Sequence, residues 1–151
     1  MQAGLRSMRA AVAVALVAFV FAACGDSAGT GPTPTTVVGN WNVTSLTAPT
    51  QPSWGDAVKD DGMSISLALT SGGSYTLTAS GDDPTDPWVC TNTASCSYTG
   101  TYSTSGNTIT WDQGTASEAT ATFSFSAGSM TINYAANAVI TDPYKLILQP
   151  K

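Results

Sequence analysis

The residue types that carry most enzymatic chemistry are scarce in this chain. It contains no histidine, and its two arginines, Arg6 and Arg9, both lie near its start. Because serine and cysteine nucleophiles are usually activated by a histidine, Ser–His and Cys–His catalytic pairs are excluded. Paired carboxylates remain, as in glycosidases, but Asp60 and Asp61 precede a glycine and read as solvated loop acids. The sequence therefore predicts no enzyme and no cofactor.

The densest acidic cluster is the segment 81–87, which contains Asp82, Asp83 and Asp86. Its glycine, prolines and aspartates together predict a loop. Clustered carboxylates suit a hard cation such as Ca²⁺, but their spacing is not that of an EF-hand loop. We therefore predict no metal site, and the three aspartates are the alternative candidate for calcium.

Residues 1–23 have the pattern of a targeting segment. Arg6 and Arg9 form a short positive region, and Ala10–Phe21 is an uncharged apolar run. Ala22 and Ala23, which follow, are small. This order is typical of a secretory signal peptide, and the apolar run is too short for a membrane-spanning helix.

The end of this segment, Phe21-Ala22-Ala23-Cys24, resembles the signal of bacterial lipoproteins, with Phe21 where that family usually has leucine. The resemblance implies that residues 1–23 are removed and that Cys24 is lipidated. Two or more acyl chains anchor a protein stably to a bilayer. Gly25 follows the cysteine instead of aspartate, which in enterobacterial lipoproteins implies the outer membrane of the cell envelope. The alternative is an ordinary signal peptide with an incidental cysteine.

Lipidation of Cys24 would leave Cys90 and Cys96 as a pair, since the chain has three cysteines. The oxidising cell envelope permits a disulfide, and an unpaired cysteine in a secreted protein requires an explanation. The bridge would close a short ring and contribute roughly 2 kcal/mol in the loop-entropy model. Zinc would need two further ligands, and no histidine is present to supply them. We therefore expect Cys90 and Cys96 to form a disulfide.

Removal of residues 1–23 leaves Lys59, Lys145 and Lys151 against ten acidic residues, a net charge of 3 − 10 = −7. Nucleic acids bind through cationic contacts to phosphate, and anionic lipid headgroups attract basic segments. The composition therefore excludes a nucleic-acid partner and charge-driven membrane binding. Residues 24–36, rich in glycine, proline and threonine, predict a flexible tether.

Residues 37–151 alternate threonine or serine with apolar residues, which indicates β-structure. About eight strands are predicted, at residues 39–46, 63–70, 75–80, 97–103, 108–112, 118–126, 130–134 and 144–149. A short helix is expected around Gly55 to Asp60, in the long connection after the first strand.

Short turns, such as 71–74 and 105–107, join most of these strands. An antiparallel meander is stable when it closes, because closure removes exposed strand edges. Eight strands enclose an interior just wide enough for side chains or one small ligand. The predicted fold is therefore an all-β up-and-down barrel. The alternative is a β-sandwich, which would have longer Greek-key crossings.

Residues 37–151 also resemble the bacterial lipocalin-like domains. Gly39-Asn40-Trp41 matches the Gly-x-Trp of their first strand, and 71–77 and 100–110 match two later hairpin segments. The resemblance implies that Gly39 and Trp41 close one end of the barrel, with Lys145 in place of the family's arginine against that tryptophan. It also implies that Trp54, in the long first loop, lies over the open mouth.

Large aromatic residues either fill a barrel core or line a ligand pocket. The ligand-lining candidates are Trp54, Leu67, Leu69, Tyr75, Leu77, Tyr102, Trp111, Phe123 and Phe125. With the resemblance, they predict a membrane-anchored barrel that binds a small apolar or amphipathic molecule. The alternative is a structural or protein-interaction module of the envelope with a packed core.

Overall fold

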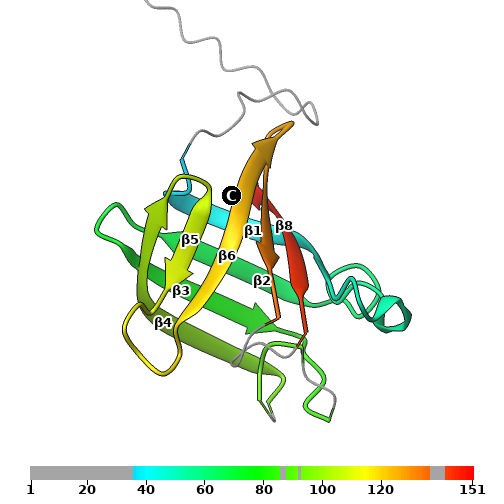
Figure 1. Ribbon diagram of the computed structural model, residues 1–151. Helices are drawn as coiled ribbons and strands as arrows, with labels where there is room; N and C mark the ends of the chain where they lie inside the picture. The colour runs from blue at the N-terminus through cyan, green and yellow to red at the C-terminus, as the bar shows by residue number, and fades with distance from the viewer. Residues whose placement is uncertain (1–35, 86–87, 92, 137–141) are drawn as a thin grey trace, which may run out of the picture.

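A computed structural model describes residues 36–85, 88–91, 93–136 and 142–151. Its strands are β1 (Gly39–Thr47), β2 (Ser64–Leu69), β3 (Ser74–Ser80), β4 (Ser95–Ser105), β5 (Thr108–Trp111), β6 (Ala119–Ser126), β7 (Ser129–Tyr134) and β8 (Tyr144–Pro150). Each strand pairs antiparallel with the next, and β8 pairs with β1, so the sheet is a closed barrel (Figure 1). The predicted all-β meander barrel is confirmed, and its closure excludes the β-sandwich.

The two ends of the barrel differ in how the chain crosses them. At one end, called the turn end, residues 70–73, 106–107 and 127–128 form tight turns. At the other, called the loop end, residues 48–63, 81–94, 112–118 and 135–143 connect the strands. Gly73 has a φ of 77° in the first tight turn, a conformation that glycine adopts without steric cost.

The strands follow the alternation that the sequence predicts, with one exception in β1. Ile65, Leu67 and Leu69 of β2 are buried while the residues between them are more exposed, as expected for a strand with one face in a core. In β1 the register against β8 shifts between Val43 and Ser45. A bulge of this kind changes which residues face inward. It turns Leu46 toward the interior, whereas Ser45 is buried against Asp56 of the first loop.

The first long connection contains a short 3₁₀ helix at Pro52–Trp54. The helix predicted around Gly55 to Asp60 is wrong, because Asp56 instead forms a β-bridge with Thr47 and residues 57–60 form a turn. Proline at the first helical position favours the earlier site, since its φ is already suited to a helix.

The Asp56 carboxylate holds this connection against β1. It accepts hydrogen bonds from Ser45 Oγ at 2.6 Å and from the Leu46 N–H at 3.1 Å, and it forms an ion pair with Lys59 at 3.2 Å. Burial alone would raise the pKa of Asp56, but the bonds from Ser45, Leu46 and Lys59 outweigh it and lower the pKa below its ordinary value of 3.8. The first loop is therefore fixed to the barrel wall by an ionised side chain.

The predicted signal peptide, Cys24 and all of the tether except Thr36 lie outside the described residues. Among the residues that are described, no helix has the length and apolar character needed to cross a membrane.

Candidate functional site

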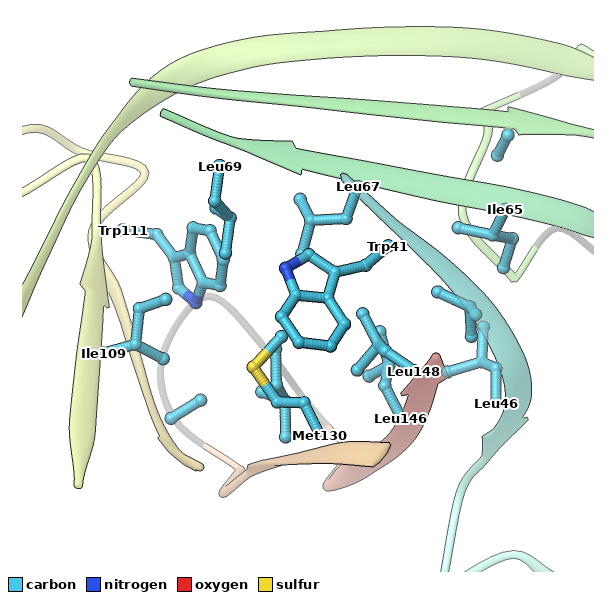
Figure 2. Close-up of a cluster of buried hydrophobic side chains, with 14 of the residues drawn as sticks. Trp41, Leu46, Ile65, Leu67, Leu69, Ile109, Trp111, Met130, Leu146 and Leu148 are labelled. Atoms are coloured by element: carbon cyan, nitrogen blue, oxygen red, sulfur yellow. The ribbon is translucent and has the colours of Figure 1, made fainter. Parts of the chain in front are cut away.

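The turn end of the barrel is filled by a packed core around Trp41. This side chain is 2% exposed, its Nε1 donates a hydrogen bond to the Val37 carbonyl at 2.8 Å, and its ring stacks on Phe125 at 6.2 Å. Figure 2 shows Trp41 in the middle of the labelled cluster, with Met130 and Leu148 among its neighbours. The structure thus places Gly39 and Trp41 at the end of the barrel that side chains close.

Lys145 does not accompany Trp41, which corrects the placement implied by the resemblance. On the β1–β8 ladder Trp41 lies opposite Pro150, whereas Lys145 lies opposite Thr47 at the loop end. The lysine near Trp41 is Lys151, whose N–H donates to the Asn40 carbonyl at 2.9 Å. The antiparallel direction of β8 explains the difference, because the end of β8, not its start, runs beside the start of β1.

A cavity of about 420 Å³ occupies the other part of the interior and reaches the loop end. Aromatic and aliphatic side chains dominate its wall, which consists of Leu46, Ile65, Leu67, Tyr75, Leu77, Trp88, Val89, Tyr98, Trp111, Asp112, Ser117, Ala119, Ile132, Tyr134, Tyr144 and Leu146. Its size and apolar character fall within the range of small-molecule sites in proteins.

Four of the nine ligand-lining candidates are in this wall: Leu67, Tyr75, Leu77 and Trp111. The other five lie elsewhere. Phe125 stacks on Trp41 at the turn end, Phe123 packs on Phe125, and Leu69 is buried in the same core. The Tyr102 hydroxyl donates to the Thr70 carbonyl at 2.7 Å beside a tight turn. Trp54 is 46% exposed and packs on Trp88.

Sequence reasoning missed most of the wall at the loop end. Leu46 faces the cavity because of the bulge in β1, which strict alternation does not anticipate. Val89 comes from a loop, and Asp112 and Ser117 come from the connection between β5 and β6. Tyr134 is the last residue of β7 and Tyr144 is the first residue of β8, and the two lie directly opposite each other. Aromatic residues at strand ends that flank long loops were the available signal.

The β3–β4 connection forms part of the cavity rim and is tightly organised. Cys90 and Cys96 form a disulfide, as predicted. The buried Asp82 carboxylate accepts hydrogen bonds from the N–H groups of Trp88 at 2.9 Å, Val89 at 2.7 Å and Cys90 at 2.5 Å. Trp88 Nε1 donates to Asp61 at 3.0 Å. The loop therefore holds Trp88 and Val89 at the cavity by several independent contacts.

This geometry bears on the alternative calcium candidate. Both Asp82 oxygens accept backbone N–H groups, and Asp83 accepts the N–H and hydroxyl of Thr85. Asp86 lies outside the described residues. Within the described ranges, no group of three or more histidine, cysteine, aspartate or glutamate residues is arranged to hold a metal ion. The structure thus uses Asp82 to shape the loop.

One carboxylate, that of Asp112, lies in the cavity wall, and two neighbours, Tyr75 and Thr101, hold it there. It accepts hydrogen bonds from the Tyr75 hydroxyl at 2.8 Å and from the Thr101 N–H at 2.9 Å. The Asp112 N–H in turn donates to the Thr101 carbonyl at 2.8 Å. Asp112 has a φ of 48°, which is unusual for a residue with a side chain. The β4–β5 ladder ends at the pair Tyr102–Trp111. Beyond it, the Asp112 carboxylate accepts the Thr101 N–H that the backbone of a longer β5 would otherwise accept.

Gly100 provides the space for this arrangement. A Cβ at this position would collide with the Asp112 carboxylate and would lie 2.7 Å from Tyr75 Cε1. Because real Cβ atoms do not approach other atoms so closely, a larger residue would displace Asp112, Tyr75 or both. Gly100 is therefore needed for packing at the cavity wall.

The phenol groups at this side of the cavity stay protonated at neutral pH. Burial, the hydrogen bond to Asp112 and the charge of Asp112 raise the pKa of Tyr75 to about 12. Burial and the nearby Tyr75 raise the pKa of Tyr134 well above its ordinary value. Trp111 contacts both rings: it packs edge to face with Tyr75 at 5.1 Å and stacks on Tyr134 at 6.4 Å. Its Nε1 is buried with no acceptor among the described residues.

Comparisons with known proteins give little beyond this geometry. No family model matches the chain, and no curated protein matches it. The chain is similar to a crystal structure of a mutant of the fluorescent protein UnaG, at 10% identity and a TM-score of 0.39. The match covers 76% of this chain and 96% of that one.

Proposed function

We propose that this chain is a binding protein of the bacterial cell envelope that holds one small apolar or amphipathic molecule inside its barrel. The cavity of about 420 Å³ carries this proposal, because it is lined almost entirely by aromatic and aliphatic side chains. An eight-stranded barrel has an interior wide enough for one small ligand. A packed interaction module would fill the loop end as Trp41 and its neighbours fill the turn end.

The proposal includes a lipid anchor. The segment ending in Cys24 resembles a lipoprotein signal, and the stretch that follows has the composition of a flexible tether. Diacyl or triacyl modification of Cys24 would keep the barrel at the membrane, in the outer membrane by the same resemblance. The function is binding without catalysis, since neither histidine nor arginine is present in the chain after residue 23.

Native mass spectrometry tests the binding function. The chain from residue 24 onward, with Cys24→Ser to keep it unlipidated, would be isolated from a bacterial envelope without detergent. We expect one additional mass of a few hundred daltons for each chain, lost on denaturation. A bare mass, together with no stoichiometric uptake of a fluorescent apolar probe, would contradict the proposal and favour an interaction module.

Membrane fractionation of the full chain tests the anchor. We expect the wild-type protein in the outer-membrane fraction, with acyl mass on a peptide that begins at Cys24. The Cys24→Ser variant should be soluble in the same cells. Recovery of the wild-type chain in the soluble fraction would contradict the anchor and leave the barrel's binding function intact.

A further inference from the structure

The charged side chains around the cavity indicate which head group its ligand carries. Asp112 is the one charged side chain among the described residues of the cavity wall. The three lysines lie elsewhere: Lys59 pairs with Asp56, Lys145 is exposed on β8, and Lys151 follows the end of β8. Residues 24–35, 86–87, 92 and 137–141, which the structure does not describe, include no lysine or arginine.

Within the part of the chain that the structure describes, the Asp112 carboxylate forms no ion pair with a lysine. Its hydrogen-bond donors, the Tyr75 hydroxyl and the Thr101 N–H, are neutral groups. These bonds stabilise and orient the carboxylate, but they leave a full negative charge at the wall of an otherwise apolar space. Opposite charges attract more strongly in such a space than in bulk water, and like charges repel more strongly.

Aromatic rings surround the same part of the cavity. Tyr75, Trp111 and Tyr134 form a continuous group of rings, and Trp88, Tyr98 and Tyr144 complete the wall. The faces of aromatic rings carry negative electrostatic potential and attract cations, most strongly when water is excluded. Both the carboxylate and the rings therefore favour the same sign of charge in a ligand.

We propose that the cavity selects a lipophilic amine, a molecule with an apolar body and a cationic ammonium group, and rejects fatty acids. The ammonium lies at the Asp112 carboxylate, and the apolar body lies against Leu67, Leu77 and the aromatic rings. The inference rests on the proposed binding function and adds the chemical class of the ligand. A carboxylate head group would find no cation in the wall and would face the charge of Asp112.

A series of probes with one tail and three head groups tests this inference. Dodecylamine, dodecanol and dodecanoic acid would each compete with the neutral dye N-phenyl-1-naphthylamine for the unlipidated chain from residue 24 onward, below their micelle concentrations. We expect the amine to bind at least about tenfold more tightly than the acid, with the alcohol between them. An acid that binds as tightly as the amine, or an alcohol that matches it, overturns the inference.

The same series separates this inference from the function on which it rests. If neither the dye nor any of the three probes binds, the binding function fails and the inference fails with it. If all bind and the order is reversed or flat, only the choice of an amine fails.

Two matched variants locate the effect. Asp112→Asn keeps the size of the side chain and removes its charge, and we expect about tenfold weaker amine binding with little change for the alcohol. Glu118→Gln removes the same charge from the exposed last residue of the same connection. Its amide oxygen can still accept the Gly114 N–H, and amine binding should not change. Equal losses for amine and alcohol in Asp112→Asn, or equal effects of both variants on the amine, contradict recognition of charge by Asp112.

Discussion

The two ends of this barrel are built from the same strands but use their side chains differently. At the turn end, Trp41 is buried, hydrogen-bonded to Val37 and stacked on Phe125. At the loop end, Trp88 is partly buried at the cavity rim, with Trp54 packed against it edge to face at 5.8 Å. Trp41 closes the turn end of the barrel, whereas Trp88, with Trp54 packed on it, borders the opening of the cavity at the loop end.

The difference follows from what connects the strands. At the turn end, short turns join the strands and large strand side chains fill the interior. At the loop end, three of the longer connections are each fixed by the carboxylate of an aspartate. Asp56 fixes the first loop, Asp82 fixes the second, and Asp112 fixes the third. Stability thus comes from apolar packing at one end, while buried or half-buried carboxylates shape the other.

The largest predicted effect is loss of the packed end. Trp41→Ala should lower the free energy of unfolding by about 3–5 kcal/mol, the usual range for removing a buried aromatic side chain. Trp54→Ala makes the same chemical change on an exposed side chain at the loop end, and it should cost about 0.5–1.5 kcal/mol through loss of the contact with Trp88. Urea denaturation of both variants measures the difference. Equal losses of unfolding free energy in the two variants would show that the two ends contribute equally to stability.

The next effect tests whether a carboxylate stabilises the loop end. Asp56→Asn should lower the free energy of unfolding by about 1.5–3 kcal/mol at neutral pH, because it removes a charged acceptor of several hydrogen bonds. The pKa of Asp56 is lower in the folded chain than its ordinary value of 3.8. Its contribution is therefore complete above the unfolded value and is lost as the pH falls through the folded value.

Urea denaturation of wild type and Asp56→Asn from neutral pH down to about pH 2 measures this dependence. The gap in stability between them should narrow below about pH 4. Glu118→Gln, at an exposed site, serves as the control and should follow wild type throughout. A gap between wild type and Asp56→Asn that is constant with pH would mean that the charge of Asp56 does not stabilise the first loop.

A smaller effect is expected at Gly100, where a single methyl group would enter the cavity wall. Gly100→Ala should lower the free energy of unfolding by about 1–3 kcal/mol, as overpacking does, and should weaken amine binding by moving Asp112. Gly72→Ala is the matched control, since its Cβ would meet only Thr70 Oγ1 at an ordinary 3.7 Å. Denaturation and probe titration of both variants provide the measurement. Unchanged amine binding in Gly100→Ala would show that Gly100 does not contribute to the amine site.

The sequence predicted the closed end better than the open end, and the reason is physical. Trp41, Val43 and the apolar residues of β2 follow the two-residue period of a strand, which the sequence displays directly. The disulfide followed from the number of cysteines and the expected compartment. Each of these features depends on local pattern or on composition.

The open end depends on contacts that the two-residue alternation of a strand does not predict. Asp112 reaches the cavity because its positive φ turns it toward Thr101, and because Gly100, on another strand, lacks a side chain. Leu46 faces inward because of a bulge. Lys145 was placed beside Trp41 by family resemblance, and strand direction puts it at the other end. These errors all concern register or pairs of residues distant in the chain, which one sequence does not reveal.

The smallest effect concerns the phenol that binds Asp112. Because the pKa of Tyr75 is raised to about 12, its ionisation should come later than that of a solvent-exposed tyrosine, whose pKa is about 10. The neutral form is favoured by folding, so the stabilisation is complete below about pH 10 and is lost as the pH rises toward 12. Absorbance titration near 295 nm of wild type and Tyr75→Phe would isolate this group.

Asp112→Asn separates the causes of that raised pKa. Burial is the first cause, and it stays in the variant, whereas the charge of Asp112 is removed. The late-titrating component assigned to Tyr75 should therefore move to lower pH and remain above the value of an exposed tyrosine. Glu118→Gln should leave it unchanged. If Asp112→Asn also leaves it unchanged, burial alone sets the pKa of Tyr75, and the negative charge at the cavity wall is weaker than a lipophilic amine would need.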